Sequence, residues 1–195
     1  IVSQNVTTRD DADKEQPFNL RVPGGVQTIG AGGKIYDVAR LQIFQGDQIR
    51  GLSGCCSSTP FPGRRVLAQP LHEPAALAAN LANTGSPTDS VTIAADGSVA
   101  AFVPARRAMS WQLTSPNGTP VVRERVWVTF QPGEVRVCGS CHGVNEFDQA
   151  GHTLPTNQPQ ALLKLLQAWK ANNSGNPTPT ATPMIRVIRP STTIT

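Results

Sequence analysis

Residues 91–103 read VTIAADGSVAAFV, and this stretch predicts a tight reversal between two β-strands. Apolar, β-prone residues lie on both sides of Asp96-Gly97. Asp-Gly is a preferred dipeptide for two-residue hairpin turns, because such turns need positive φ angles. We therefore expect an antiparallel hairpin centred on these two residues.

The flanking sequence continues the pattern. Residues 109–114 (MSWQLT) and 121–130 (VVRERVWVTF) surround Pro116-Asn117-Gly118, which predicts a second strand pair. Residues 34–44 (KIYDVARLQIF) and the shorter run 26–29 are also β-like. The 17 glycines and 17 prolines favour many short strands and turns. The predicted fold class is mainly β, an antiparallel β-sandwich-like domain with a short C-terminal helical segment and extended termini.

Two helices are expected. The first covers residues 73–81 (EPAALAANL), with Pro74 in its first turn. The second covers residues 159–171, with Asn157 as its expected cap. Four apolar residues of the second helix recur at helical spacing: Leu162, Leu165, Leu166 and Trp169. This stripe suits packing on the protein core or on one face of a bound cofactor equally well.

Composition divides the chain into three parts. Residues 1–137 form a β-rich domain, residues 138–173 a cofactor-binding segment with its helix, and residues 174–195 a Pro/Thr linker with a terminal β-strand. A β-prone segment behind a linker can add to an open sheet edge of another copy. We therefore expect self-association into an oligomer or filament.

The most specific motif is Cys138-Gly139-Ser140-Cys141-His142. Cys-x-x-Cys-His is the attachment signature of a c-type haem. Each thiol can add across one vinyl group of the porphyrin, and the histidine becomes the proximal axial ligand of the iron. We therefore predict one covalent haem c, held by Cys138 and Cys141, with His142 on the iron. The bland alternative is a thiol pair in a zinc site or a disulfide.

The sixth iron ligand is not fixed by the motif. The other two histidines are the candidates for bis-histidine ligation, with His72 preferred and His152 second. Met109 and Met184 are the candidates for His/Met ligation. An open sixth position would instead permit small molecules to bind.

Several other groups have weaker signals. The adjacent Cys55 and Cys56 could form a strained disulfide, pair with another chain or stay reduced, and a structural role is the expected one. Trp127, Phe147 and Trp169 could pack on a porphyrin or belong to the core. Five arginines lie in segments before the motif, and one or two could pair with haem propionates: Arg106, Arg107, Arg123, Arg125 and Arg136.

Charge and hydropathy limit the partners. The net charge is +4, but the basic residues are scattered, so no nucleic-acid footprint is expected. No apolar stretch approaches the roughly 20 residues of a transmembrane helix. Haem c attachment takes place outside the cytoplasmic membrane in bacteria, so we expect an extracytoplasmic protein with redox partner proteins.

Four short motifs and the pentapeptide carry a resemblance to a known family: Ala95-Asp96-Gly97-Ser98, Val103-Pro104-Ala105, Trp111-Gln112-Leu113, Gln131-Pro132-Gly133-Glu134 and the segment 138–143 (CGSCHG). Residues 95–169 resemble the C-terminal haem region of hydrazine synthase alpha subunits. In that family, β-rich modules lead through a Pro-Gly-Glu turn into a Cys-x-x-Cys-His site. The resemblance implies an exported β module that bears haem. It does not imply hydrazine synthesis, because the chain has one haem motif.

The leading functional hypothesis is a monohaem c-type cytochrome that carries single electrons, more a carrier than an enzyme. A haem enzyme or gas-binding protein with an open distal site is the second hypothesis. A structural or adhesive β module, in which the thiols bind zinc or oxidise, is the third.

Overall fold

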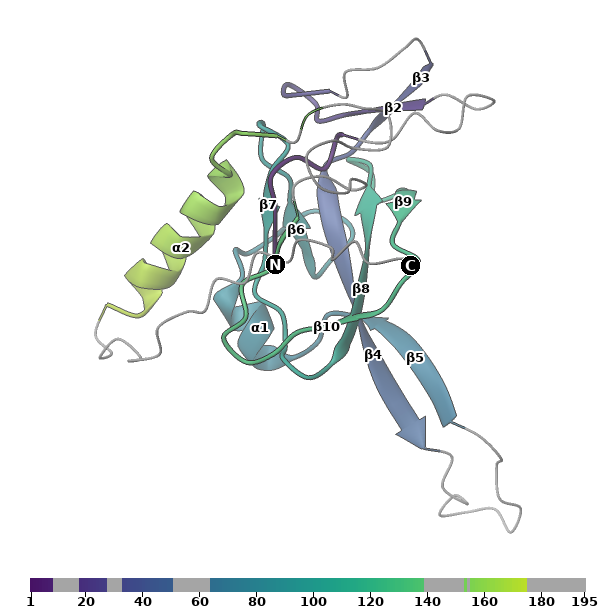
Figure 1. The fold of residues 1–195 in the computed structure, drawn as a ribbon, viewed down its shortest axis with the longest axis vertical. Coiled ribbons are helices and arrows are strands. Elements are labelled where there is room, and N and C mark those ends of the chain that lie inside the picture. The colour runs from purple at the N-terminus through teal and green to yellow at the C-terminus, as the bar shows by residue number, and fades with distance from the viewer. Residues whose placement is uncertain (9–17, 28–32, 51–63, 139–152, 154, 175–195) are drawn as a thin grey trace, which may run out of the picture.

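The computed structural model describes residues 1–8, 18–27, 33–50, 64–138, 153 and 155–174 of the 195-residue chain. These residues form a mainly β structure of open sheets with two helices, which confirms the expected predominance of strands (Figure 1). The strands group into a six-stranded sheet, a three-stranded sheet and a two-stranded sheet.

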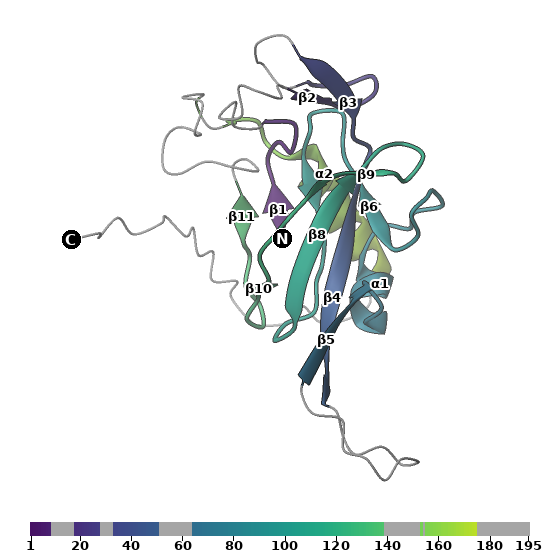
Figure 2. The same cartoon turned by 90° about the vertical axis from the view of Figure 1, so that its right-hand side faces the viewer.

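The six-stranded sheet is built around β4 (Arg40–Arg50) and β8 (Ala108–Thr114), which pair antiparallel along seven residues (Figure 2). β5 (Arg64–Pro70) and β6 (Ser90–Thr92) also pair with β4, while β9 (Pro120–Arg123) and β10 (Val128–Thr129) pair with β8. β4 and β8 both contribute buried residues to the core, including Leu41, Ile43, Met109 and Leu113. The outer half of the β4–β5 hairpin extends away from the rest of the molecule (Figure 1).

The three-stranded sheet has β1 (Val2–Ser3) at its centre. β1 pairs antiparallel with β7 (Val99–Ala100) and parallel with β11 (Val137–Cys138). The register places Val2 opposite Val137 and Ser3 opposite Cys138. This pairing brings the first residues of the chain to the first residue of the Cys-x-x-Cys-His motif.

The two-stranded sheet joins β2 (Phe18–Arg21) to β3 (Lys34–Asp37) in parallel. An ion pair of 2.8 Å between the Arg21 guanidinium and the Asp37 carboxylate crosses it. The sequence pattern predicts one strand over residues 34–44, but the structure divides it into β3 and β4. The chain passes between them through Val38, which is fully buried.

The turn at Asp96-Gly97 is confirmed. Gly97 has a φ of 80°, and its N–H donates to the carbonyl of Ala94 at 2.9 Å. The strands on either side differ from a simple hairpin, however. β6 pairs with β4, and β7 pairs with β1, so this turn joins two sheets.

The second predicted strand pair is confirmed in its first half. β8 and β9 pair around a turn in which Gly118 has a φ of 86°. The expected strand 121–130 is broken between β9 and β10. The break has a local cause, because the Glu124 carboxylate accepts hydrogen bonds from the N–H groups of Arg125 and Val126 at 2.7 and 3.0 Å. These two N–H groups are therefore not available to a sheet.

Both expected helices are present. α1 (Pro74–Ala79) begins with its proline, as predicted. α2 (Gln160–Asn172) packs beside β7 (Figure 1). The expected cap of α2 is wrong: Asn157 bonds to Gln4 and Asp96 instead, and the helix N–H groups of Gln160 and Ala161 donate to Asp96 Oδ2 and Ser98 Oγ.

Candidate functional site

A cavity of about 760 Å³ lies beside the first cysteine of the motif. Its volume falls in the range of small-molecule and cofactor sites, about 300–1,000 Å³. Most of the lining is apolar and comes from both larger sheets and the segment between β9 and β10: Ile1, Val6, Leu41, Val99, Ala100, Ala101, Trp111, Leu113, Val121, Val122 and Val126. Such a lining suits an apolar ligand body with few polar contacts.

Cys138 ends β11 and contributes to the wall of this cavity. It is a free cysteine. Burial raises the pKa of its thiol above 9.0. At neutral pH the group is therefore a neutral thiol, unlike the low-pKa thiolate of a disulfide oxidoreductase.

Three further residues of the lining have polar side chains besides Ser3: Arg123, Glu124 and Arg125. The Arg123 guanidinium lies over the Phe44 ring, 5.3 Å from its centroid. Glu124 is held by the two backbone N–H groups that break the strand. Arg125 is exposed.

Sequence reasoning missed two polar residues of this wall, Ser3 and Glu124, and Ser3 is the buried one. Its side chain is 8% exposed, and its hydroxyl has no hydrogen-bond partner within the described part of the chain. A buried hydroxyl without a partner costs about 1–3 kcal/mol. The residue therefore combines a place in the wall of the cavity, one strand away from Cys138, with a hydroxyl that lacks a partner.

Most of the remaining predicted site residues lie outside the described residues: Cys141, His142, His152, Cys55, Cys56, Met184 and Phe147. The haem thioether at Cys141 and the iron ligand at His142 therefore stay predictions. The linker and terminal strand expected beyond residue 174 also fall outside the described part.

His72 follows β5 and does not line the cavity. Its Nε2 lies 2.9 Å from the Asp47 carboxylate, and its Nδ1 lies 2.9 Å from the carbonyl oxygen of Pro70. A role as sixth iron ligand stays a prediction, and it would require one of these contacts to break. Met109 is fully buried in the core and does not line the cavity either.

The apolar stripe of α2 is used for core packing. Ala161 and Leu165 cluster with Val2 and Ala100. Successive residues of a strand point to opposite faces, so the helix and Ser3 lie on opposite sides of β1. Of the four residues of the expected stripe, Leu165 is buried, Leu162 and Trp169 are half-buried, and Leu166 is 47% exposed.

Of the aromatic residues and arginines predicted to contact a porphyrin, some line the cavity and others lie elsewhere. Trp127 packs near Gly46 and is absent from the cavity lining among the described residues. The Arg136 side chain donates a hydrogen bond to the Glu134 carboxylate, and its guanidinium lies over the Phe130 ring. Of the five arginines, the two that line the cavity are Arg123 and Arg125, and their pairing with propionates stays a prediction.

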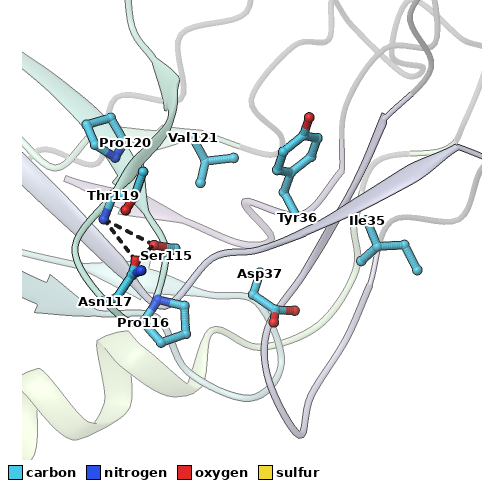
Figure 3. Close-up of a pocket in the computed structure, with 9 residues that line it drawn as sticks. All are labelled: Ile35, Tyr36, Asp37, Ser115, Pro116, Asn117, Thr119, Pro120 and Val121. Carbon is cyan, nitrogen blue, oxygen red and sulfur yellow. Dashed lines mark hydrogen bonds between the residues drawn. The ribbon is translucent and has the colours of Figure 1, made fainter.

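A second hollow of about 720 Å³ lies between β3 and the turn that joins β8 to β9 (Figure 3). The polar groups of the turn bond to one another: the Thr119 N–H donates to Ser115 Oγ at 3.1 Å and to Asn117 Oδ1 at 3.2 Å. The lining holds no cysteine, histidine or methionine among the described residues. We therefore place the candidate site in the cavity at Cys138.

Two further features are absent from the described residues. No cluster of three or more histidine, cysteine, aspartate or glutamate residues suited to a metal ion occurs among them. Neither described helix has the length and apolar character that crossing a membrane requires.

The fold and cavity define a mainly β domain with a cysteine at an apolar site. Residues 47–143 match the family model of the hydrazine synthase alpha subunit middle domain. This match supports a relation to hydrazine synthase alpha-like proteins. It begins earlier than the resemblance described above, ends one residue after His142, and points to the middle domain where the resemblance named the C-terminal haem region. Searches of curated proteins and of solved structures gave no match.

Proposed function

We propose that this chain is an extracytoplasmic monohaem c-type cytochrome that carries single electrons. One haem c is bonded through thioethers to Cys138 and Cys141, and His142 is the proximal ligand of its iron. The macrocycle would lie in the apolar cavity at Cys138. The two larger sheets would then contact it from either side, as in a β-sandwich.

The observation that supports this proposal most is that one residue belongs to both the motif and the cavity wall. Cys138 is the first residue of Cys-x-x-Cys-His and also part of the cavity wall. The backbone fixes it there, because the Gln4 N–H donates to the Cys138 carbonyl at 3.0 Å and the Val2 N–H to the Arg136 carbonyl at 2.9 Å. A thioether at this position would hold a porphyrin against apolar walls.

Haem supplies an iron that changes between ferric and ferrous states, which is the chemistry of a one-electron carrier. The chain's own residues bind it, keep water from it and set its reduction potential through burial and charge. In this proposal His72 is the leading sixth ligand and His152 the second. Redox partner proteins would supply and accept the single electrons.

The test uses two matched cysteine pairs. The full chain is produced in an exporting host that attaches haem c, and a pyridine haemochrome spectrum measures the covalent haem. We expect one haem per chain, lost in Cys138→Ser/Cys141→Ser and kept in the control Cys55→Ser/Cys56→Ser. A native chain without a c-type spectrum, or equal haem in both variants, would contradict the proposal.

The second candidate function is a haem enzyme or gas-binding protein, in which the sixth position of the iron would be open. Carbon monoxide added to the reduced protein would shift the Soret band in that case. A six-coordinate, low-spin spectrum without a shift would favour the electron carrier.

A further inference from the structure

The Ser3 hydroxyl differs from most other buried hydroxyls of the described chain. Most of these have short hydrogen bonds: Ser90 Oγ donates to the Pro87 carbonyl at 2.6 Å, Ser98 Oγ to Asp96 at 2.6 Å and Thr7 Oγ1 to Asn5 at 2.7 Å. Burial of polar groups in proteins is normally accompanied by such bonds. Ser3 is therefore an exception that needs a physical reason.

Three buried side-chain atoms in the described residues have no partner: Ser3 Oγ, Gln45 Oε1 and Thr114 Oγ1. Of these three residues, Ser3 lines the cavity at Cys138, and the other two do not. The hydroxyl oxygen itself has less than 1 Å² of accessible surface, so it reaches a bound group only after rotation about the Cα–Cβ bond of Ser3. Such a rotation between staggered positions would give the hydroxyl the partner that it lacks. Thr114 is the natural control, because it carries an orphaned hydroxyl away from the cavity.

The register of β1 fixes where this hydroxyl lies. Ser3 is the residue opposite Cys138 on the neighbouring parallel strand, and both belong to the wall of the same cavity. Val2, the preceding residue, packs on the α2 side of the strand. The Ser3 side chain is therefore held on the cavity side, next to the proposed point of covalent attachment.

We propose that Ser3 is a cofactor-binding residue, whose hydroxyl donates a hydrogen bond to an oxygen atom of the group held at Cys138. This inference rests on the proposed haem. The acceptor is an oxygen atom, and it can belong to one of two groups: a haem propionate, or an oxygen-bearing ligand on the iron. The bond supplies the partner that the protein alone does not give to Ser3.

The test compares haem-loaded Ser3→Ala with haem-loaded Thr114→Val. Loss of one hydrogen bond, about 1 kcal/mol, should lower the melting temperature of Ser3→Ala by about 2–4 °C. Thr114→Val removes an orphaned hydroxyl and should leave the melting temperature unchanged or raise it. Ser3→Thr keeps a hydroxyl and should restore much of the loss.

Two spectroscopic measurements separate the oxygen sources. A shift of the haem propionate bending modes in the resonance Raman spectrum of Ser3→Ala, absent in Thr114→Val, identifies a carboxylate acceptor. A shift of the C–O stretch in the reduced carbon monoxide adduct identifies a ligand on the iron. Either shift supports the inference.

If neither spectrum changes in Ser3→Ala, the inference is wrong, even when the melting temperature falls, because a purely structural hydroxyl would also lower it. The haem content of the native chain, measured as the pyridine haemochrome, shows whether the proposed function fails or only the role of Ser3. Absence of haem overturns the proposed function and this inference together. Full haem content with unchanged spectra overturns the role of Ser3 alone.

Discussion

Gly97 shows how one backbone angle positions the site. Its φ of 80° lies in the region that L-residues avoid, and a Cβ there would lie 2.2 Å from Asn5 Oδ1. Asn5 Oδ1 already accepts from the Thr7 N–H at 2.9 Å. The turn between the two sheets and the segment that follows Ser3 therefore share one tightly packed contact.

The first residue-scale prediction compares two glycines with the same kind of backbone. Gly133 has a φ of 74°, but a Cβ there would meet nothing within 4 Å. We expect Gly133→Ala to lose about 1–2 kcal/mol of unfolding free energy from backbone strain. Gly97→Ala should lose about 1–3 kcal/mol more, from overpacking against Asn5. Urea denaturation measures both, and equal losses would show that the contact with Asn5 has no energetic effect.

A second residue-scale prediction concerns the Glu124 carboxylate, which accepts from two backbone N–H groups and breaks the strand between β9 and β10. Glu124→Ala should lower the unfolding free energy by about 0.5–1.5 kcal/mol, the usual net contribution of a hydrogen bond, because water can replace the carboxylate at these exposed N–H groups. Thr129→Ala, at an exposed position of β10, is the control. If both variants unfold at the same urea concentration, the carboxylate does not stabilise this turn.

At the scale of elements, α2 is held by a carboxylate far from it in sequence. Burial raises the pKa of the Asp96 carboxyl, but hydrogen bonds from Ser98, Gln160 and Asn157 together outweigh it, so the pKa lies below its ordinary value of 3.8. A carboxyl group whose pKa is lower in the folded state than in the unfolded state stabilises the fold at pH values above the unfolded pKa. This stabilisation is lost as the pH falls through the folded value, below 3.8.

Asp96→Asn should therefore destabilise the protein by about 1–3 kcal/mol at pH 7, because the amide replaces an acceptor with a donor. The difference from the native chain should shrink as the pH falls below 3.8. Glu73→Gln is the matched control, since Glu73 occupies the N-cap position of α1 without a side-chain cap bond. A constant difference between native and Asp96→Asn protein across the acid range would argue against this role of the carboxylate.

Local sequence signals predicted the elements that depend on neighbouring residues. The Asp96-Gly97 turn, the proline start of α1 and the extent of α2 are examples. Features set by distant residues were not predictable. The cap of α2 comes from the turn at Asp96, and the strand beside Cys138 comes from the start of the chain.

The same reasoning explains the site. The Cys-x-x-Cys-His motif carries its chemistry in five adjacent residues, so Cys138 could be singled out from sequence alone. Ser3 could not, because its place in the cavity wall depends on a parallel pairing between β1 and β11. A lone serine in a β-prone segment has no sequence signal for ligand binding.

At the scale of the whole molecule, the open sheets leave strand edges that another chain could pair with. In the described residues, the six-stranded sheet ends at β5, which pairs with β4 alone. We propose that copies of the chain add strands to one another through the β-prone segment near the C-terminus, since the N-terminal strand β1 is already paired on both sides. Light scattering should show large assemblies of the full chain and discrete particles after deletion of residues 178–195. Assemblies that persist after the deletion would contradict this mode of association.

The central claim is that one haem is bonded to Cys138 and Cys141. Mass spectrometry of the exported protein after trypsin digestion tests it directly, because the peptide 137–164 follows Arg136, ends at Lys164 and contains both cysteines. The account predicts that this peptide carries the added mass of one haem. Recovery of the same peptide from the native protein at its bare amino-acid mass would contradict the account.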